Sequence, residues 1–208
     1  MIVALEGIDG AGKNTLVQKL IRELGATDRI DSAATMAFPR YNESLHAQLA
    51  ADALHGKMGD LTDSAHGMAV MFALDRYGVV EELRQWASSP SDVLLLDRYV
   101  ASNAAYTSAR TGRIDDRAWI AELEFDRLGL PRPALQVLVD TAPDTARARA
   151  RSREQADASR TRDRYERDAS LQDATYTAYV EMAETNWESQ WVRATDAAPI
   201  MEVIGHLH

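Results

Sequence analysis

Residues Gly7 to Lys13 have the composition and spacing of a loop that binds phosphate groups. Gly7 is followed, after four residues, by Gly12 and Lys13, which is the spacing of a Walker A loop. Backbone N–H groups of such a loop surround phosphate oxygens, and the lysine adds positive charge. Glycines are needed because a side chain would block this close approach and because the turn requires unusual φ angles. The alternative is an ordinary glycine turn.

The segments on either side of the loop favour phosphate binding. Residues 2–6 form a short apolar run that is typical of a buried parallel strand. After the loop, apolar residues recur every three or four positions, as on one face of a helix: Leu16, Leu20, Ile21 and Leu24. A helix that begins directly behind the loop adds the positive end of its dipole to the site. The strand–loop–helix order therefore predicts a phosphate site.

Asn14 is the one departure from the loop pattern. A Ser or Thr at this place normally offers a hydroxyl to Mg²⁺, and here Thr15 comes one position late. The departure leaves the loop prediction unchanged but puts the usual metal geometry in question.

Asp97 and Arg98 follow the clearest buried strand of the sequence, residues 93–96. The carboxyl end of a central strand lies beside the phosphate loop, where parallel-sheet proteins bind ligands. Asp97 can orient Mg²⁺ through water, and the guanidinium of Arg98 can hold a phosphate with two hydrogen bonds. The alternative is a surface salt bridge at a strand end.

Asn103 and Tyr106 lie three positions apart in a predicted helix that begins near Ser102, so they share a face. An amide can bond the N3–H and carbonyl edge of a pyrimidine, and a tyrosine can pack against a sugar. Taken alone, each residue is more often a helix cap or a core aromatic.

The segment 62–86 has the periodicity of one long helix with an apolar stripe, formed by Met68, Met71, Phe72, Val79, Leu83 and Trp86. Asp75 and Arg76 lie on or beside that stripe, and Phe72 projects together with Arg76. Charges on an apolar face indicate either a buried ion pair or a pocket wall. In a pocket, the phenyl ring would stack on a base and the guanidinium would bond its carbonyl.

Arginine is concentrated between residues 147 and 167, around a polar stretch at 154–159 that lacks apolar anchors. We expect this stretch to be mobile. Beside a phosphate site, a mobile basic segment is typical of a lid that closes over ATP and excludes water. The alternative is a solvated charged face, which nearby acidic residues favour. The phosphate loop favours the lid, which we place at about residues 147–164.

The elements that position these residues alternate between short apolar strands and helices. Further strands are predicted at 33–38, ended by Pro39, at 135–139 and from Trp191, and further helices at 115–128, 143–152 and 165–187. This alternation predicts a parallel sheet covered by helices on both faces. We therefore expect a single three-layer α/β domain over residues 1–208.

Composition limits the class of protein. The chain has 208 residues, of which 46% are hydrophobic, with no cysteine and a net charge of −9. The charge argues against broad binding to a nucleic acid backbone, and no apolar run reaches the roughly 18 residues of a membrane span. Without a secretory signal or disulfides, the chain suits the reducing cytoplasm. We expect a cytoplasmic protein with a local basic pocket, and neither nucleic acid nor membrane as a partner.

Taken together, the motifs resemble the thymidylate (dTMP) kinase family, and most closely its actinobacterial members. The matching segments follow the family order over residues 1–170: 6–13, 38–41, 72–76, 97–99 with 102–106, and 163–168. The strand-end motif with its Asn-Tyr pair is fairly specific within P-loop kinases. The resemblance implies a P-loop fold with five parallel strands, a homodimer, and transfer of the ATP γ-phosphate to dTMP, giving dTDP.

The resemblance also implies a role for individual residues. The loop would contact the ATP phosphates through Gly7, Asp9, Gly10, Ala11, Gly12, Lys13, Asn14 and Thr15. Arg98 and Arg40 would hold the dTMP phosphate, with Tyr41 nearby. Phe72 would stack on thymine, while Arg76 bonds its O4 and Asn103 its N3. Tyr106 and Tyr165 would crowd a ribose 2′-OH. The dTMP site would also include Phe38, Pro39, Ser102 and Asp163, and Mg²⁺ would be held near Asp9, Asp97 and Glu166.

Family members supply a catalytic arginine either from the phosphate loop or from the lid. Residues 8–11 contain no basic side chain, so the resemblance assigns this role to the lid, where we choose Arg153 and Arg160. They would act with Lys13, Arg98 and Asp9. No general base is required, because the acceptor is already an anionic phosphate. The alternatives are another P-loop deoxynucleotide or nucleoside kinase, or a P-loop ATPase that acts on a protein partner.

Overall fold

The centre of the protein is one parallel sheet of five strands. A computed structural model describes residues 1–156 and 163–207. The strands are β1 (Ile2–Glu6), β2 (Ser32–Ala37), β3 (Asp92–Asp97), β4 (Leu135–Val139) and β5 (Gln190–Ala194), in the spatial order β2-β3-β1-β4-β5. Every residue of β1 and β4 is buried, as expected for inner strands covered on both faces. The predicted five-stranded parallel sheet is confirmed.

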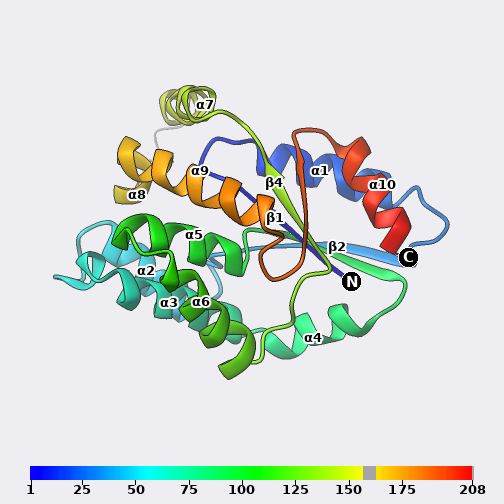
Figure 1. Cartoon of the computed structure of the whole chain (residues 1–208), viewed down its shortest axis with the longest axis horizontal. Helices are drawn as coiled ribbons and strands as arrows, with labels where there is room; N and C mark the ends of the chain where they lie inside the picture. The colour runs from blue at the N-terminus through cyan, green and yellow to red at the C-terminus, as the bar shows by residue number, and fades with distance from the viewer. Residues whose placement is uncertain (157–162, 208) are drawn as a thin grey trace.

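Helices connect the strands and cover both faces of the sheet. They are α1 (Lys13–Leu24), α2 (Leu45–Leu54), η1 (Leu61–Asp63), α3 (Ala65–Tyr77), α4 (Val80–Ser88), α5 (Val100–Thr111), α6 (Asp115–Ala121), η2 (Glu122–Arg127), α7 (Pro143–Ala156), α8 (Arg164–Arg167), α9 (Ala169–Glu184) and α10 (Ala197–Leu207). Figure 1 shows α1 and α10 on one side of the strands and α4 and α5 on the other. Helix α9 packs against α5 and the β4–β5 edge. The three-layer prediction is therefore confirmed.

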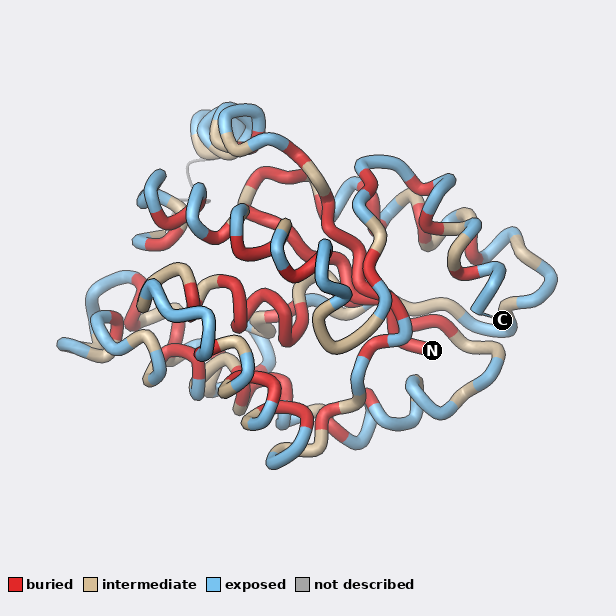
Figure 2. Tube along the Cα trace, viewed as in Figure 1, coloured by how far each residue is buried: buried red, intermediate tan, exposed pale blue. Residues whose placement is uncertain are grey.

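The main core lies between the sheet and these helices. Leu5, Leu95 and Tyr179 are fully buried there, and Figure 2 shows continuous buried stretches at the centre of the sheet, where β1, β3 and β4 lie. A second apolar cluster joins α2, α3 and the α8 region, where Met68 and Tyr165 are buried. Among the described residues, no helix is both long and apolar enough to cross a membrane.

The prediction of one long helix over residues 62–86 is wrong. Three elements occupy it, the short η1 turn and then α3 and α4. Ser64 caps α3 by accepting a hydrogen bond from Gly67 N at 3.0 Å. Gly78 closes the same helix, and a Cβ at this position would lie 3.0 Å from Arg40 Nη2. Apolar periodicity continued across both caps, so it could not reveal the breaks.

The helix predicted at 165–187 is also divided. Asp163 caps α8 through Glu166 N at 2.9 Å, and Asp168 caps α9 through Leu171 N at 3.0 Å. A capping residue has extended backbone, so the second cap interrupts the helix. The predicted helix at 115–128 changes to π-helix at Glu122, and the helix that begins at Pro143 extends to Ala156 rather than ending at 152.

Candidate active site

The phosphate loop joins the end of β1 to the start of α1. Gly7, Gly10 and Gly12 have φ angles of 145°, 84° and 106°, values that favour glycine. At Gly10 space is also limiting, because a Cβ there would lie 2.1 Å from Ala146 O in α7. The backbone of the loop is therefore shaped by three glycines and by close packing against α7.

Lys13 is buried within the loop. Its Nζ donates to Gly7 O at 2.9 Å and to Ile8 O at 3.2 Å. Burial and the nearby charge of Arg98 lower the pKa of Lys13 to about 8. An incoming phosphate would offer stronger, charged acceptors to the same ammonium group.

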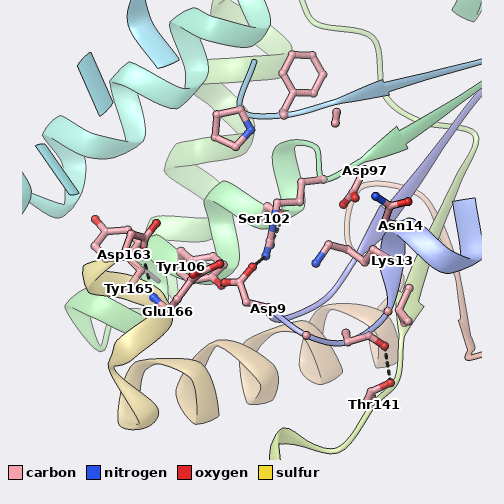
Figure 3. Close-up of a pocket in the computed structure, with 18 of the residues that line it drawn as sticks. Asp9, Lys13, Asn14, Asp97, Ser102, Tyr106, Thr141, Asp163, Tyr165 and Glu166 are labelled. Carbon is pink, nitrogen blue, oxygen red and sulfur yellow. Dashed lines mark hydrogen bonds and ion pairs between the residues drawn. The ribbon is translucent and has the colours of Figure 1, made fainter. Parts of the chain in front are cut away.

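Two side chains from outside the loop bond its backbone at Ala11. Thr141 Oγ1 donates to Ala11 O at 2.8 Å, and Arg149 Nη1 donates to the same oxygen at 3.2 Å. The second contact brings an arginine of α7 directly onto the phosphate loop. Figure 3 shows the Thr141 bond below the loop and Lys13 directed into the cavity.

Asp9 links the loop to the end of β3 and to helix α5. Its Oδ1 accepts from Arg98 Nη2 at 2.5 Å, and its Oδ2 accepts from Tyr106 OH at 2.9 Å. Arg98 has a φ of 69°, an uncommon conformation that occurs at functional sites more often than elsewhere. The expected alternative, a surface salt bridge, does not describe this pair, because the Arg98 side chain is only 15% exposed.

Gln172 of α9 is a third residue that bonds Asp9. Its Oε1 accepts from Asp9 N at 3.3 Å, while its Nε2 donates to Tyr106 OH at 3.2 Å and to Tyr165 O at 3.0 Å. Tyr106 and Tyr165 stack with ring centroids 5.9 Å apart. One amide therefore connects the phosphate loop, helix α5 and the segment that follows the lid.

Acidic side chains lie on the side of Asp9 that faces away from Lys13. Burial alone would raise the pKa of Asp9, but the charges of Arg98 and Lys13 outweigh it and hold the pKa at about 2. Burial and the charges of Asp9 and Asp163 raise the pKa of Glu166 to about 7. Figure 3 shows Asp9 between Lys13 and the group formed by Asp163, Tyr165 and Glu166. Within residues 1–156 and 163–207, no three acidic or histidine side chains form a ready metal cluster.

Arg76 and Asn103, which line the same cavity, meet over a buried carboxylate. Glu124 accepts from Arg76 Nε at 2.5 Å and Nη2 at 2.7 Å, and from Asn103 Nδ2 at 2.8 Å. The two expectations for the charged helix face, a buried ion pair and a pocket wall, are thus both met at Arg76. Asp75 forms a second ion pair, with Arg40.

One cavity of about 1270 Å³ joins these groups, and it exceeds the usual volume of a pocket for one small ligand, about 300–1000 Å³. Most of the predicted site residues line it: Asp9, Gly10, Ala11, Gly12, Lys13, Asn14, Thr15, Phe38, Pro39, Tyr41, Phe72, Arg76, Asp97, Arg98, Ser102, Asn103, Tyr106, Arg153, Asp163, Tyr165 and Glu166. Gly7 and Arg40 do not. Arg40 Nε bonds Asp75 Oδ1 at 3.1 Å, and this bond fixes the loop that carries Pro39 and Tyr41.

Some arginines of the predicted lid line the cavity, and another forms ion pairs with acidic side chains. Arg149 and Arg153 line the cavity, as a lid requires. Arg147 instead bonds Asp144 and Asp173, as on a solvated charged face. Arg160, the other candidate for a catalytic arginine, lies outside the described residues, as do residues 157–159 of the stretch expected to be mobile.

Three residues of the site were missed by the sequence reasoning. Gln172 and Thr141 carry no signal, because a polar residue in a helix or loop is ordinary. Glu124 does carry one, since it follows Ile120 by four positions and precedes Phe125, and both of these are buried. An acidic residue on such an apolar face indicates a buried partner.

The β2-β3-β1-β4-β5 sheet, with a glycine-rich loop between β1 and α1, defines a P-loop nucleotide-binding protein. Arg98 lines the same cavity as the loop and suits a second phosphorylated ligand, as in a kinase of small substrates. Comparison with known proteins specifies the family. A sequence model described as thymidylate kinase matches residues 5–203. A thymidylate kinase of Mycobacterium tuberculosis (strain H37Rv) is 49% identical over 197 residues, which are 92% of this chain and 90% of the relative.

More distant proteins agree with this assignment. A thymidylate kinase of Xanthomonas euvesicatoria pv. vesicatoria is 33% identical over 153 residues, 74% of this chain and 62% of that relative. The solved thymidylate kinase of Candida albicans superposes with a TM-score of 0.72 at 18% identity, over 99% of this chain and 91% of that chain, and so supports the fold. The chain belongs to the thymidylate kinase family. It is an enzyme that uses ATP to phosphorylate dTMP to dTDP, and the resemblance to actinobacterial members is confirmed.

Proposed function

We propose that this cavity holds ATP and dTMP end to end, with Asp9 and Arg98 at the point of phosphate transfer. The observation that carries this assignment is the Asp9–Arg98 ion pair, which joins the phosphate loop to the end of β3 in the cavity that Arg76 and Asn103 also line. The ATP phosphates would bind the loop amides and Lys13. Arg98 would hold the dTMP phosphate, and Arg149 and Arg153 would approach from the lid.

The apolar end of the cavity suits a pyrimidine. Phe72 and Phe38 line it together with Arg76 and Asn103. A phenyl ring offers a face on which a base can stack, while the guanidinium donates to a carbonyl oxygen and the amide oxygen accepts from N3–H. These are the groups of thymine O4 and N3. Tyr106 and Tyr165 stack beside Asp9, where they would restrict the space for a ribose 2′-OH.

The residues around Asp9 fit Mg²⁺. This ion prefers oxygen ligands, and it usually keeps several waters while binding one or two carboxylates and substrate phosphates. The low pKa of Asp9 keeps one carboxylate ionised at the cavity. Burial, together with the charges of Asp9 and Asp163, raises the pKa of Glu166, and a cation bound nearby would favour its ionised form. Asp97 lines the cavity near Lys13. A bound Mg²⁺ would neutralise charge on the transferring phosphate.

The residues of the chain accelerate the reaction by alignment and charge. The dTMP phosphate is itself the nucleophile, so no side chain needs to remove a proton. Lys13, Arg98 and the lid arginines neutralise the negative charge spread over the phosphate oxygens. The two nucleotides are positioned for in-line transfer, which makes the step effectively unimolecular.

The experiment that tests the assignment is ADP formation as a function of added monophosphate. We expect ADP formation to depend on dTMP, and to be slower with dUMP, dCMP, dGMP or thymidine. ATP hydrolysis that proceeds equally without any monophosphate would contradict it and would favour a P-loop ATPase. Faster turnover of thymidine or of another monophosphate would favour a different nucleotide or nucleoside kinase.

The homodimer and the cytoplasmic location stay predictions. Sedimentation velocity of the purified chain tests the homodimer.

A further inference from the structure

Glu124 lies behind the proposed base site and does not reach the cavity. Its side chain is completely buried, and Arg76 and Asn103, which it bonds, both line the cavity while Glu124 does not. It belongs to the π-helical segment η2, which contacts α3, the helix of Arg76. π-Helical turns are rare and occur often at functional sites.

Glu124 fixes the direction in which the Asn103 amide points. The two hydrogens of Asn103 Nδ2 are donated to Ala69 O at 2.9 Å and to Glu124 Oε1 at 2.8 Å. Both partners can only accept hydrogen bonds, so a reversed amide would place its oxygen against two acceptors. The amide nitrogen is therefore turned to the protein, and the oxygen remains as the acceptor for a ligand.

Glu124 also fixes the guanidinium of Arg76. It takes the edge formed by Nε and Nη2, in the two-bond geometry that suits a carboxylate. Among the described residues, Nη1 has no hydrogen-bond partner, so its hydrogens remain for a ligand. The pair thus offers one acceptor, Asn103 Oδ1, beside one donor, Arg76 Nη1.

This pattern distinguishes two kinds of pyrimidine. Thymine and uracil present a donor at N3 and an acceptor at O4, which complement the amide oxygen and the guanidinium. Cytosine presents an acceptor at N3 and an amino donor at C4, so it would oppose acceptor to acceptor and donor to donor. A site built on such bonds strongly disfavours the wrong base, because its buried polar groups are left unpaired.

We propose that Glu124 is a specificity-determining positioning residue, which excludes cytosine nucleotides by fixing the Asn103 amide and the Arg76 guanidinium together. This inference rests on the proposed function, which places the base against those two residues. Glu124 acts through them and does not touch the base.

The test is Glu124→Gln, with kcat/KM measured for dTMP and dCMP at saturating ATP. Glu124 Oε1 accepts from both Arg76 Nη2 and Asn103 Nδ2, and Oε2 accepts from Arg76 Nε. A glutamine replaces one of these two oxygens with a donor NH2 group, so at least one N–H of Arg76 faces a donor and the negative charge beside the guanidinium is lost. Ala69 O still favours the original amide direction, so discrimination falls rather than inverts. We expect the dTMP/dCMP ratio of kcat/KM to fall about 10-fold or more, while KM for ATP changes less than about 2-fold.

Three further variants make the result specific. Glu122→Gln, on the exposed side of the same η2 segment, is the matched control and should keep the wild-type ratio. Glu124→Asp keeps the charge but shortens the side chain, so it should also lower the dTMP/dCMP ratio of kcat/KM. It provides the test if the glutamine variant does not fold. Asn103→Ala tests the proposed base site itself, because it removes the acceptor directly.

The outcomes separate the two proposals. If Asn103→Ala lowers the ratio but both Glu124 variants keep it, the inference on Glu124 is overturned and the proposed base site stands. Equal losses with dTMP, dCMP and ATP in the Glu124 variants would also overturn it, because a merely structural role would act on all substrates. If Asn103→Ala leaves the ratio unchanged, the proposed base site is itself wrong.

Discussion

Asp9 in the phosphate loop and Arg98 at the end of β3 form an ion pair with Oδ1 and Nη2 2.5 Å apart. The pair joins the loop that we propose binds the donor to the strand end that we propose binds the acceptor. Parallel pairing of β1 with β3 places Leu5 opposite Asp97, so the two segments leave the sheet at the same edge. Sheet register therefore brings Asp9 and Arg98 together.

Arg76→Ala should impair binding of dTMP and spare ATP. Arg76 lies on the wall of the proposed base site, whereas the proposed ATP site is the phosphate loop. A hydrogen bond to a charged group contributes about 1.5–3 kcal/mol, so we expect kcat/KM for dTMP to fall roughly 10- to 150-fold. Steady-state kinetics with each substrate varied in turn give both KM values.

The same variant should be less stable than the wild type. Removal of Arg76 leaves the fully buried Glu124 carboxylate without its cation, which is a strongly destabilising change of about 3–5 kcal/mol. Kinetics should therefore be measured well below the melting temperature. Arg113→Ala, at an exposed arginine, is the control. An equal rise of KM for both substrates would refute the assignment of Arg76.

Arg153→Ala should lower kcat rather than nucleotide affinity. The phosphate loop offers no arginine, and Arg153 reaches the cavity from α7. By analogy with arginine fingers, which act on transition-state charge, we expect a loss of about 100-fold or more in kcat. Single-turnover kinetics and nucleotide titrations separate the two effects, and Arg160→Ala is expected to give the same result if that residue carries the role.

Arg151→Ala is the matched control for the lid, because Arg151 is exposed and is absent from the cavity wall. If both the Arg153 and the Arg160 variants keep near-normal kcat, the catalytic arginine lies elsewhere. Arg149 would then be tested next, since it already contacts Ala11 O in the phosphate loop.

The strands, the loop and most of the cavity wall could be predicted because their signals are local. Buried parallel strands are continuous apolar runs, and the glycine spacing of the loop reflects the backbone angles it needs. The placement of Asn103 and Tyr106 on one face also followed from spacing alone, and both line the cavity. Helix ends were less predictable, since the caps at Ser64 and Asp168 interrupt segments whose apolar periodicity continues.

The supporting residues depend on contacts between distant segments. Gln172 bonds Asp9, which lies 163 positions earlier in the chain, and no local pattern marks such a partner. Arg40 is a second residue whose partner is distant in the sequence. The family resemblance predicts that it holds the dTMP phosphate, whereas in the fold its guanidinium bonds the carboxylate of Asp75.

Glu166→Gln should change how stability depends on pH. The ordinary pKa of a glutamate is 4.5, and burial with the charges of Asp9 and Asp163 raises that of Glu166 to about 7. Between these values the folded state holds a proton that the unfolded state has lost, so this group destabilises the folded state increasingly as pH rises. We expect the melting temperature of the variant, relative to wild type, to increase from pH 4.5 to pH 7.5.

The measurement is thermal unfolding without nucleotide or Mg²⁺, in one buffer series at constant ionic strength. Glu202→Gln, on the exposed part of α10, is the control for loss of one carboxylate. A difference between Glu166→Gln and wild type that stays constant, or decreases, across this range would show that Glu166 does not carry a raised pKa.

Asp9→Ala and Asn14→Ala should differ sharply in activity. Asp9 lines the cavity and bonds Arg98, Tyr106 and Gln172, so its loss would disturb both proposed phosphate sites and remove a proposed oxygen ligand of Mg²⁺. We expect a loss of about 100-fold or more in kcat/KM. Asn14 is exposed at the start of α1 and, among the described residues, has no side-chain hydrogen bond. Its replacement should cost less than about tenfold.

The difference follows from the geometry that Mg²⁺ requires. The ion has a tight octahedral shell at about 2.0–2.1 Å, and the asparagine side chain is longer than the serine or threonine that usually occupies this position. Phosphates, waters and a carboxylate can complete the shell without it. An Asn14→Ala enzyme whose Mg²⁺ requirement rises steeply, while Asp9→Ala stays active, would contradict this view. So would a magnesium-bound structure with the Asn14 amide oxygen at about 2.1 Å from the metal, because Asn14 would then replace the missing hydroxyl as a direct ligand.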